Sequence, residues 1–236
     1  MPVKRFYKAA AAGTAPGGYT VRLDGKNIKT PLQRPLVVPT AALAAALAAE
    51  WEAQTDDIRP HAMPLNQLVN TMIDKATGHE RPAMNAEVVK YAGSDLVCYF
   101  ATHPADLVAR QEALWHPLLG WLSDEYGIRL ETAQGIQYVN QPEADMAAVK
   151  ARVEALSPAD FTVVQAVTGL TGSAVIALAV AAGRLGAEQA YAAAGVDEIY
   201  QLEKWGEDKI ARDRLNRMLR ELETVEKFRF LMQGGN

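Results

Sequence analysis

The first forty residues have the alternating apolar and polar pattern of a half-buried β-sheet. Residues 19–23 alternate in this way, and the Asp24-Gly25 dipeptide that follows suits a tight hairpin turn. The pattern predicts a return strand over residues 26–30 and another short strand over residues 36–38, which Pro39 ends because proline cannot donate to a ladder. We therefore expect a small antiparallel sheet in this part of the chain.

From Thr40 onward the apolar residues recur at helical spacing. Leu43, Leu47 and Trp51 lie four residues apart, which predicts a helix capped by Thr40 with Trp51 in the core. Further helices are expected from residue 63, over residues 82–91, over residues 104–126 with Trp115 in the core, and after residue 142. The last of them is a polar helix over about residues 208–227.

These elements predict an α+β fold of two domains. A small antiparallel, β-rich N-terminal domain would cover residues 1–60, and a larger, mainly α-helical C-terminal domain would cover residues 61–236. Residues 161–182 carry no charge and are long enough to cross a bilayer. Because threonine, serine, glycine and glutamine dilute the run and no aromatic belt flanks it, we expect a buried helix or a broken helix pair and no integral membrane span.

Composition narrows the classes of function. The formal net charge is −4, and a nucleic-acid-binding protein needs a basic surface, so we expect no nucleic-acid partner. The single cysteine, Cys98, excludes a disulfide framework and fits a reducing compartment. The basic N-terminus lacks the apolar stretch of a secretory signal.

Few residues have the spacing that chemistry requires. The four histidines do not pair at metal-ligand spacing, and the apolar neighbours of Cys98 indicate a buried small residue. We therefore predict no catalytic residue, no metal site and no cofactor. One loop-like cluster leaves an alternative open, an enzyme that binds a small molecule or anion on backbone amides, although close helix packing explains the same residues. The cluster comprises Thr168, Gly169, Leu170, Thr171, Gly172 and Ser173.

Carboxylates and aromatic residues concentrate late in the chain. A helix with a solvated face and one core aromatic residue explains them, and so does a partner-binding surface on which aromatic side chains supply area and carboxylates supply register. The residues are Asp197, Glu198, Tyr200, Glu203, Trp205, Glu207 and Asp208.

Several short stretches, in order along nearly the whole chain, resemble the ATP12 family of assembly chaperones for the F1 sector of ATP synthase. They are Lys4-Arg5-Phe6-Tyr7, Leu23-Asp24-Gly25-Lys26, Lys29-Thr30-Pro31, Leu36-Val37-Val38-Pro39-Thr40, Ala49-Glu50-Trp51-Glu52-Ala53-Gln54, Met63-Pro64-Leu65, Ser94-Asp95-Leu96-Val97-Cys98-Tyr99, Trp115-His116-Pro117-Leu118, and Tyr200-Gln201 with Trp205-Gly206.

The resemblance implies a chaperone without catalytic activity. It would bind the free F1 α subunit and prevent its aggregation until the β subunit takes its place. The resemblance also implies that an acidic residue just before the Trp-Gly motif is important, a position for which Asp197 and Glu198 both qualify. Trp51 matches a family position that is important for integrity.

The predicted partner-binding residues are Asp197, Glu198, Tyr200, Trp205 and Asp208. A one-to-one binder of this kind needs no self-association, so we expect a monomer. It would act in the cytoplasm of a bacterium, or in the mitochondrial matrix if it is a processed organellar protein.

Overall fold

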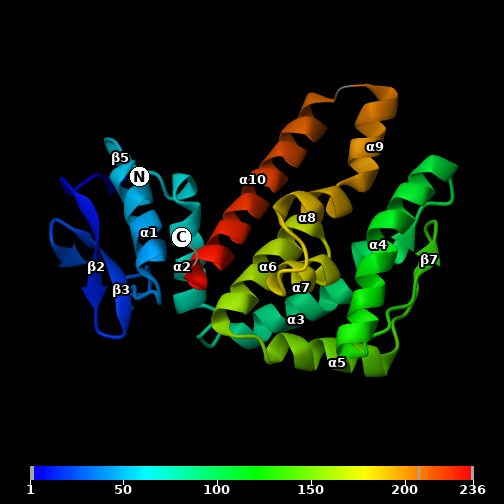
Figure 1. The fold of residues 1–236 in the computed structure, drawn as a ribbon, viewed down its shortest axis with the longest axis horizontal. Helices are drawn as coiled ribbons and strands as arrows, with labels where there is room; N and C mark the ends of the chain where they lie inside the picture. The colour runs from blue at the N-terminus through cyan, green and yellow to red at the C-terminus, as the bar shows by residue number, and fades with distance from the viewer. Residues whose placement is uncertain (1–2, 207, 235–236) are drawn as a thin grey trace. The chain divides into compact units, whose positions relative to one another are not determined.

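The computed structural model describes residues 3–206 and 208–234, and its contacts divide the chain into two compact units (Figure 1). Unit 1 comprises residues 1–81 and 224–236, and unit 2 comprises residues 82–223. The predicted boundary after residue 60 falls inside unit 1. Helix α2 (Pro64–Asp74) follows that boundary and packs against α1 (Ala41–Glu52), so both helices share one core.

Unit 1 contains the predicted small antiparallel sheet. Strands β2 (Ala10–Ala15), β3 (Gly18–Leu23) and β4 (Lys26–Asn27) pair in that order. Asp24 and Gly25 both have positive φ, 48° and 81°, as a tight hairpin turn requires. The return strand is only two residues long, and residues 36–38 contribute a single bridge between Val38 and Tyr19, because Pro35 and Pro39 cannot donate to a ladder.

Helix α1 packs against β2 and β3 (Figure 1), and its side chains Leu43 and Leu47 are buried. Its predicted cap is present: Thr40 Oγ1 accepts a hydrogen bond from Leu43 N at 3.1 Å and donates one to Leu231 O at 2.7 Å. Strand β1 (Val3–Lys4) pairs with β5 (Asp57–Ile58), and a short 3-10 helix, η1 (Pro60–Ala62), leads into α2.

Unit 2 is helical and is built around α7, in which every residue from 174 to 180 is buried. Figure 1 shows α6 and α7 within unit 2, with α3 and α5 beneath them in that view. In chain order the elements from residue 81 onward are α3 (Arg81–Ala92), η2 (Leu96–Cys98), β6 (Tyr99–Phe100), α4 (Ala105–Tyr126), β7 (Ala133–Gln134), α5 (Glu143–Glu154), α6 (Pro158–Thr171), α7 (Ala174–Ala181), α8 (Ala187–Ala194), α9 (Val196–Trp205) and α10 (Lys209–Met232). The part of α10 from residue 224 onward belongs to unit 1.

The uncharged run over residues 161–182 forms two helices, α6 and α7, which meet at Gly172. Gly172 has a φ of 72°, a left-handed conformation that ends α6. The expected broken helix pair is therefore present. In the described part of the chain, no helix is both long enough and apolar enough to cross a membrane. The predicted α+β class, a small antiparallel sheet followed by a larger helical part, is confirmed.

Candidate functional site

The predicted acidic residues begin helix α9, which packs against α4 and α8 in unit 2. Asp197 and Glu198 lie in its first turn and Lys204 in its last, so the charges complement the helix dipole. Tyr200 is buried, with 4% of its surface exposed, whereas Trp205 is 77% exposed. The helix thus holds one aromatic residue in the core and presents the other to solvent.

Asp197 joins α9 to α4. Its Oδ1 accepts a hydrogen bond from Gln111 Nε2 at 2.6 Å, and Gln111 Oε1 accepts one from Ala101 N at 2.7 Å. Gln111 is fully buried and Asp197 is half-buried, and burial raises the pKa of the Asp197 carboxyl. Asp197 therefore holds α9 against α4 within unit 2.

Glu198 and Glu203 make ion pairs with two different helices. Glu198 pairs with Arg214 of α10, and Glu203 pairs with Arg110 of α4 at 2.7 Å. The Arg110 guanidinium also lies over the Tyr200 ring, 5.2 Å from its centroid. These contacts fix the side chains at the edge of α9.

A second set of contacts centres on Asp106 of α4. Tyr200 Oη donates to Asp106 Oδ1 at 2.7 Å, and Lys204 Nζ lies 2.9 Å from Asp106 Oδ2. The hydrogen bonds from Lys204 and Tyr200 lower the pKa of Asp106 to about 2. Asp106 and Arg110 lie one helical turn apart, so α4 presents both charges to α9.

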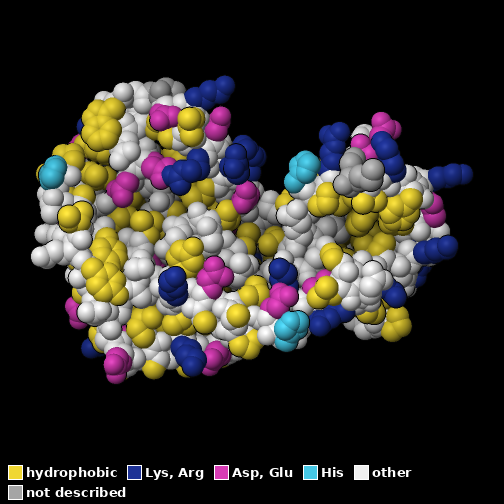
Figure 2. Space-filling view, turned by 180° about the vertical axis from the view of Figure 1, so that it is seen from behind, with side chains coloured by type: hydrophobic (Ala, Val, Ile, Leu, Met, Phe, Trp, Pro, Cys, Tyr) yellow, Lys and Arg dark blue, Asp and Glu magenta, His cyan; other side chains and the backbone are white. Residues whose placement is uncertain are grey.

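An apolar hollow of about 290 Å³ lies beside these charges. We call this region the α4–α9 surface. It comprises the residues that line the hollow, the charged residues Asp106, Arg110, Glu203 and Lys204, and the exposed Trp205. Figure 2 shows hydrophobic side chains in patches on the molecular surface, with lysine and arginine side chains at their edges. The hollow is lined by Arg110, Ala113, Leu114, Ala192, Val196 and Ile199.

The segment after Trp205 leads into α10. Asp208 is the cap of this helix, since its Oδ1 accepts hydrogen bonds from Ile210 N at 2.8 Å and Ala211 N at 3.2 Å. Ile210 is highly exposed, like Trp205. Glu207 lies outside the described residues. Asp208 thus has a structural role next to two exposed apolar side chains.

The cluster from Thr168 to Ser173 is not a loop, which corrects the prediction. Its first four residues complete α6, and Ser173 caps α7 by accepting a hydrogen bond from Ile176 N at 3.0 Å. The amide of Val175 donates to Asp95 Oδ2 at 3.1 Å, and Asp95 is fully buried. A carboxylate of the chain itself therefore accepts the hydrogen bonds of this helix N-terminus, which favours the helix-packing explanation of the cluster over the alternative of an external anion site.

The other candidate residues show no site. Cys98 is buried, and burial raises the pKa of its thiol, which disfavours a thiolate nucleophile. Among residues 3–206 and 208–234, no three histidine, cysteine or carboxylate side chains come together as metal ligands.

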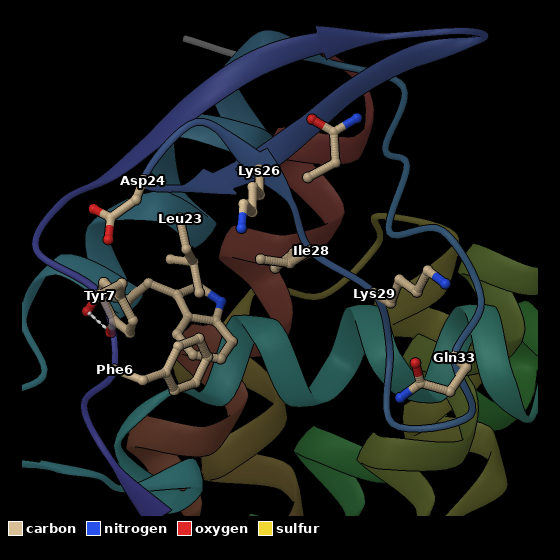
Figure 3. Close-up of a pocket in the computed structure, with 10 residues that line it drawn as sticks. Phe6, Tyr7, Leu23, Asp24, Lys26, Ile28, Lys29 and Gln33 are labelled. Atoms are coloured by element: carbon tan, nitrogen blue, oxygen red, sulfur yellow. Dashed lines mark hydrogen bonds between the residues drawn. The ribbon is translucent and has the colours of Figure 1, made fainter.

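The two tryptophans predicted for the core differ in burial. Trp115 is fully buried, and its Nε1 donates to Ala193 O at 2.8 Å. Trp51 is only half-buried, so the prediction of a core ring needs correction. Its Nε1 donates to Asn66 Oδ1 at 2.9 Å, and Trp51 is one of the residues that line a hollow in unit 1, the hollow drawn in Figure 3.

Sequence reasoning missed the contribution of α4. The spacing of Asp106, Arg110 and Leu114 was visible as an i, i+4 stripe, but nothing local indicates that α9 packs against it.

Known proteins provide an independent comparison. The sequence pattern of the ATP12 chaperone protein family matches residues 4–123. The crystal structure of Atp12 from Paracoccus denitrificans is 34% identical, with a TM-score of 0.88 over 98% of both chains. A candidate chaperone of Agrobacterium tumefaciens is 38% identical, with a TM-score of 0.82 over 95% of this chain and 85% of its own.

A more distant relative is the mitochondrial protein atp12 of Schizosaccharomyces pombe. It is 22% identical over 86% of this chain and 74% of its own length. Sequence and fold therefore agree along nearly the whole chain. The chain belongs to the ATP12 chaperone family, and it is an assembly chaperone, not an enzyme.

Proposed function

We propose that this chaperone binds the free α subunit of F1-ATP synthase through the α4–α9 surface and releases it when the β subunit takes its place. Family membership supports the general activity, and the α4–α9 surface supports the site. A subunit without its partner exposes apolar area that drives aggregation, and a chaperone must cover that area reversibly.

One observation carries the choice of this surface: α9 ends on a 77% exposed tryptophan, Trp205, and two earlier residues of the same helix, Val196 and Ile199, line an apolar hollow. Large aromatic side chains and apolar pockets are both typical of the hot spots of interaction surfaces. Arg110 lines the hollow and is held by its ion pair with Glu203, and Asp106, paired with Lys204, lies one helical turn from Arg110 on α4. Such charges favour one orientation of a partner and add little affinity when exposed.

Displacement by the β subunit then needs no catalysis. A surface with one anchor and a small apolar hollow gives moderate affinity, and a partner with a larger complementary interface competes by mass action. We propose a monomer that acts in the cytoplasm of a bacterium or in the mitochondrial matrix of a eukaryote.

Light scattering during dilution of unfolded α subunit tests this function. Wild-type protein should suppress aggregation at near-equimolar concentration. Trp205→Ala should weaken binding by about 2 kcal/mol, the scale of a hot-spot aromatic residue, without changing the melting temperature. Tyr138→Ala is the matched control, because Tyr138 is also an exposed aromatic residue of unit 2 but is not on α4 or α9.

The outcomes are distinct. If wild-type protein fails to suppress aggregation of the α subunit, the proposed client is wrong. If Trp205→Ala and Tyr138→Ala both act like wild type, the client is right and the α4–α9 surface is not its binding site.

A further inference from the structure

Unit 1 contains a hollow of about 440 Å³ that the α4–α9 surface does not explain. We call it the unit 1 hollow. Its apolar lining comprises Leu23 of β3, Ile28 after β4, Trp51 of α1 and, at the edge, Phe6. Figure 3 shows Leu23 and Ile28 extending from the side of the sheet toward Phe6. Phe6 is 70% exposed, an unusual state for a phenylalanine in a folded protein.

The apolar side of this hollow is held in place by its own contacts. Tyr7 Oη donates to Trp51 O at 2.6 Å, drawn as a dashed line in Figure 3, and the two rings meet edge to face at 5.8 Å. Trp51 is fixed further by its hydrogen bond to Asn66. A ligand would therefore meet a site that is already formed, which reduces the entropy cost of binding.

The opposite side of the hollow is a loop that is also anchored. Asp74 of α2 accepts hydrogen bonds from Thr30 Oγ1 at 2.6 Å and from Leu32 N at 3.1 Å. This anchoring holds Lys29 and Gln33 at the edge of the hollow, where Figure 3 shows both. The loop that carries Lys29 and Gln33 is thus anchored to α2.

The charge that remains available at the edge is positive. The carboxylate of Asp24 accepts hydrogen bonds from the amides of Lys8 and Ala9, at 3.0 to 3.1 Å, so its charge is directed at the backbone. Lys26 and Lys29 are exposed, and within the described part of the chain neither makes an ion pair. In Figure 3 the Lys26 side chain lies between Leu23 and Ile28. A carboxylate is the group that complements this edge.

The residues that line the unit 1 hollow come from the part of the sequence that resembles the family. Phe6, Trp51, and Leu23 with Lys26 belong to three separate stretches of sequence that resemble the family, and the fold brings these stretches together here. All residues that line the hollow lie within residues 4–123, the range that matches the family, whereas α9 lies beyond it. The part of the chain that matches the family pattern thus contains this hollow in full.

We propose that the unit 1 hollow docks an extended acidic segment of the client polypeptide. An aromatic or branched apolar side chain of that segment would pack on Phe6 and Trp51, and a neighbouring carboxylate would pair with Lys26 and Lys29. The proposal rests on the proposed function for the source of the segment, but the chemistry of the site stands on the hollow itself.

Two labelled peptides and the full-length chain test the chemistry of the site. The acidic peptide is acetyl-Gly-Glu-Leu-Phe-Glu-Gly, and the basic one carries lysine in place of both glutamates. Fluorescence anisotropy at low salt should show that the acidic peptide binds about tenfold more tightly, a difference of about 1.4 kcal/mol. Added salt should reduce this preference, because the lysines are exposed.

Charge-reversal variants locate the binding. The double variant K26E/K29E should invert the preference, so that the basic peptide binds more tightly. The matched control K90E/K227E changes the net charge by the same amount at two exposed lysines elsewhere, and it should keep the wild-type preference. Binding of the acidic peptide that survives K26E/K29E, or equal affinity for the two peptides in wild type, would overturn the proposal.

An aromatic variant tests the apolar part. Phe6→Ala should weaken the acidic peptide several-fold without lowering the melting temperature, because the ring is mostly exposed. Ile136→Ala removes another exposed apolar side chain, in unit 2, and should change nothing. Unchanged peptide affinity in Phe6→Ala would exclude an apolar anchor at this edge.

The same variants separate this proposal from the proposed function. K26E/K29E should suppress aggregation of the α subunit less well than K90E/K227E does. If both suppress it equally, the client does not dock in the unit 1 hollow, and the proposed function stands. If wild-type protein does not suppress it at all, the proposed function fails, and the peptide measurements alone decide whether the hollow binds acidic segments.

Discussion

Asp95 gives the sharpest test of the packing in unit 2. Its carboxylate is fully buried and accepts hydrogen bonds from Val97 N at 3.2 Å and Val175 N at 3.1 Å, and from Ser173 and Ala174. Burial raises the pKa of Asp95 from 3.8 to about 6, although these hydrogen bonds act in the opposite direction. The Asp95 carboxylate thus accepts the hydrogen bonds of the α7 N-terminus, and burying its charge lowers the free energy of unfolding.

The sign and size of the pH effect follow from this pKa. Between about pH 4 and pH 6 the folded protein keeps a proton on Asp95 that the unfolded chain has lost, so stability falls as the pH rises. The difference between 3.8 and about 6 corresponds to about 3 kcal/mol in full. Between about pH 4.5 and about pH 7.5, the free energy of unfolding should therefore decrease by about 2 kcal/mol.

Urea unfolding of wild type and Asp95→Asn measures this contribution. The variant should be less stable at every pH, by about 1–3 kcal/mol for each backbone donor that loses its acceptor. Because asparagine does not titrate, the stability gap should shrink by about 2 kcal/mol as the pH rises. Asp124→Asn, at an exposed carboxylate, is the control. A gap for Asp95→Asn that stays constant or widens with pH would refute the reasoning.

Substitutions at four further positions test the fold, each by urea denaturation. Trp115→Ala should lower the free energy of unfolding by about 3–5 kcal/mol, because the ring is fully buried. Trp51→Ala should lower it by only about 2 kcal/mol, because that ring is half-buried, and equal losses would contradict the difference in burial. Asp208→Ala should cost about 1 kcal/mol by removing the cap of α10, an effect that Asp208→Ser should largely restore. Asp74→Ala should cost about 1–3 kcal/mol, since two loop donors lose their acceptor, and no loss would mean that the loop is not anchored there.

Local signals predicted most of the helices. Thr40 and Ser157 cap their helices through hydrogen bonds within three residues, and Gly127 ends α4 in a left-handed conformation. These interactions depend on neighbours in the sequence, so the sequence alone contains the necessary information. The Asp24-Gly25 turn was predictable for the same reason, and strand β2 was missed because its alanines lack a β pattern.

The candidate site was only partly predictable, because its contacts are distant in sequence. Gln111 and Asp197 are 86 residues apart, and Asp106 and Tyr200 are 94 residues apart. The acidic character of α9 was visible, but the α4 side chains that neutralise it were not. Asp197 therefore looked available to a partner, and the structure shows it holding α9 to α4.

The cluster from Thr168 to Ser173 shows why a helix N-terminus is ambiguous evidence for a ligand. The free backbone amides in the first turn of any helix require hydrogen-bond acceptors. When the helix is buried, another part of the same chain can supply those acceptors. Here Asp95, about 80 residues away, supplies the acceptor. The groups left for partners are those that the fold leaves exposed to solvent. Among the described residues, the exposed rings of Phe6 and Trp205 and the exposed side chains of Lys26 and Lys29 are groups of this kind, and the two proposed binding surfaces are built on them.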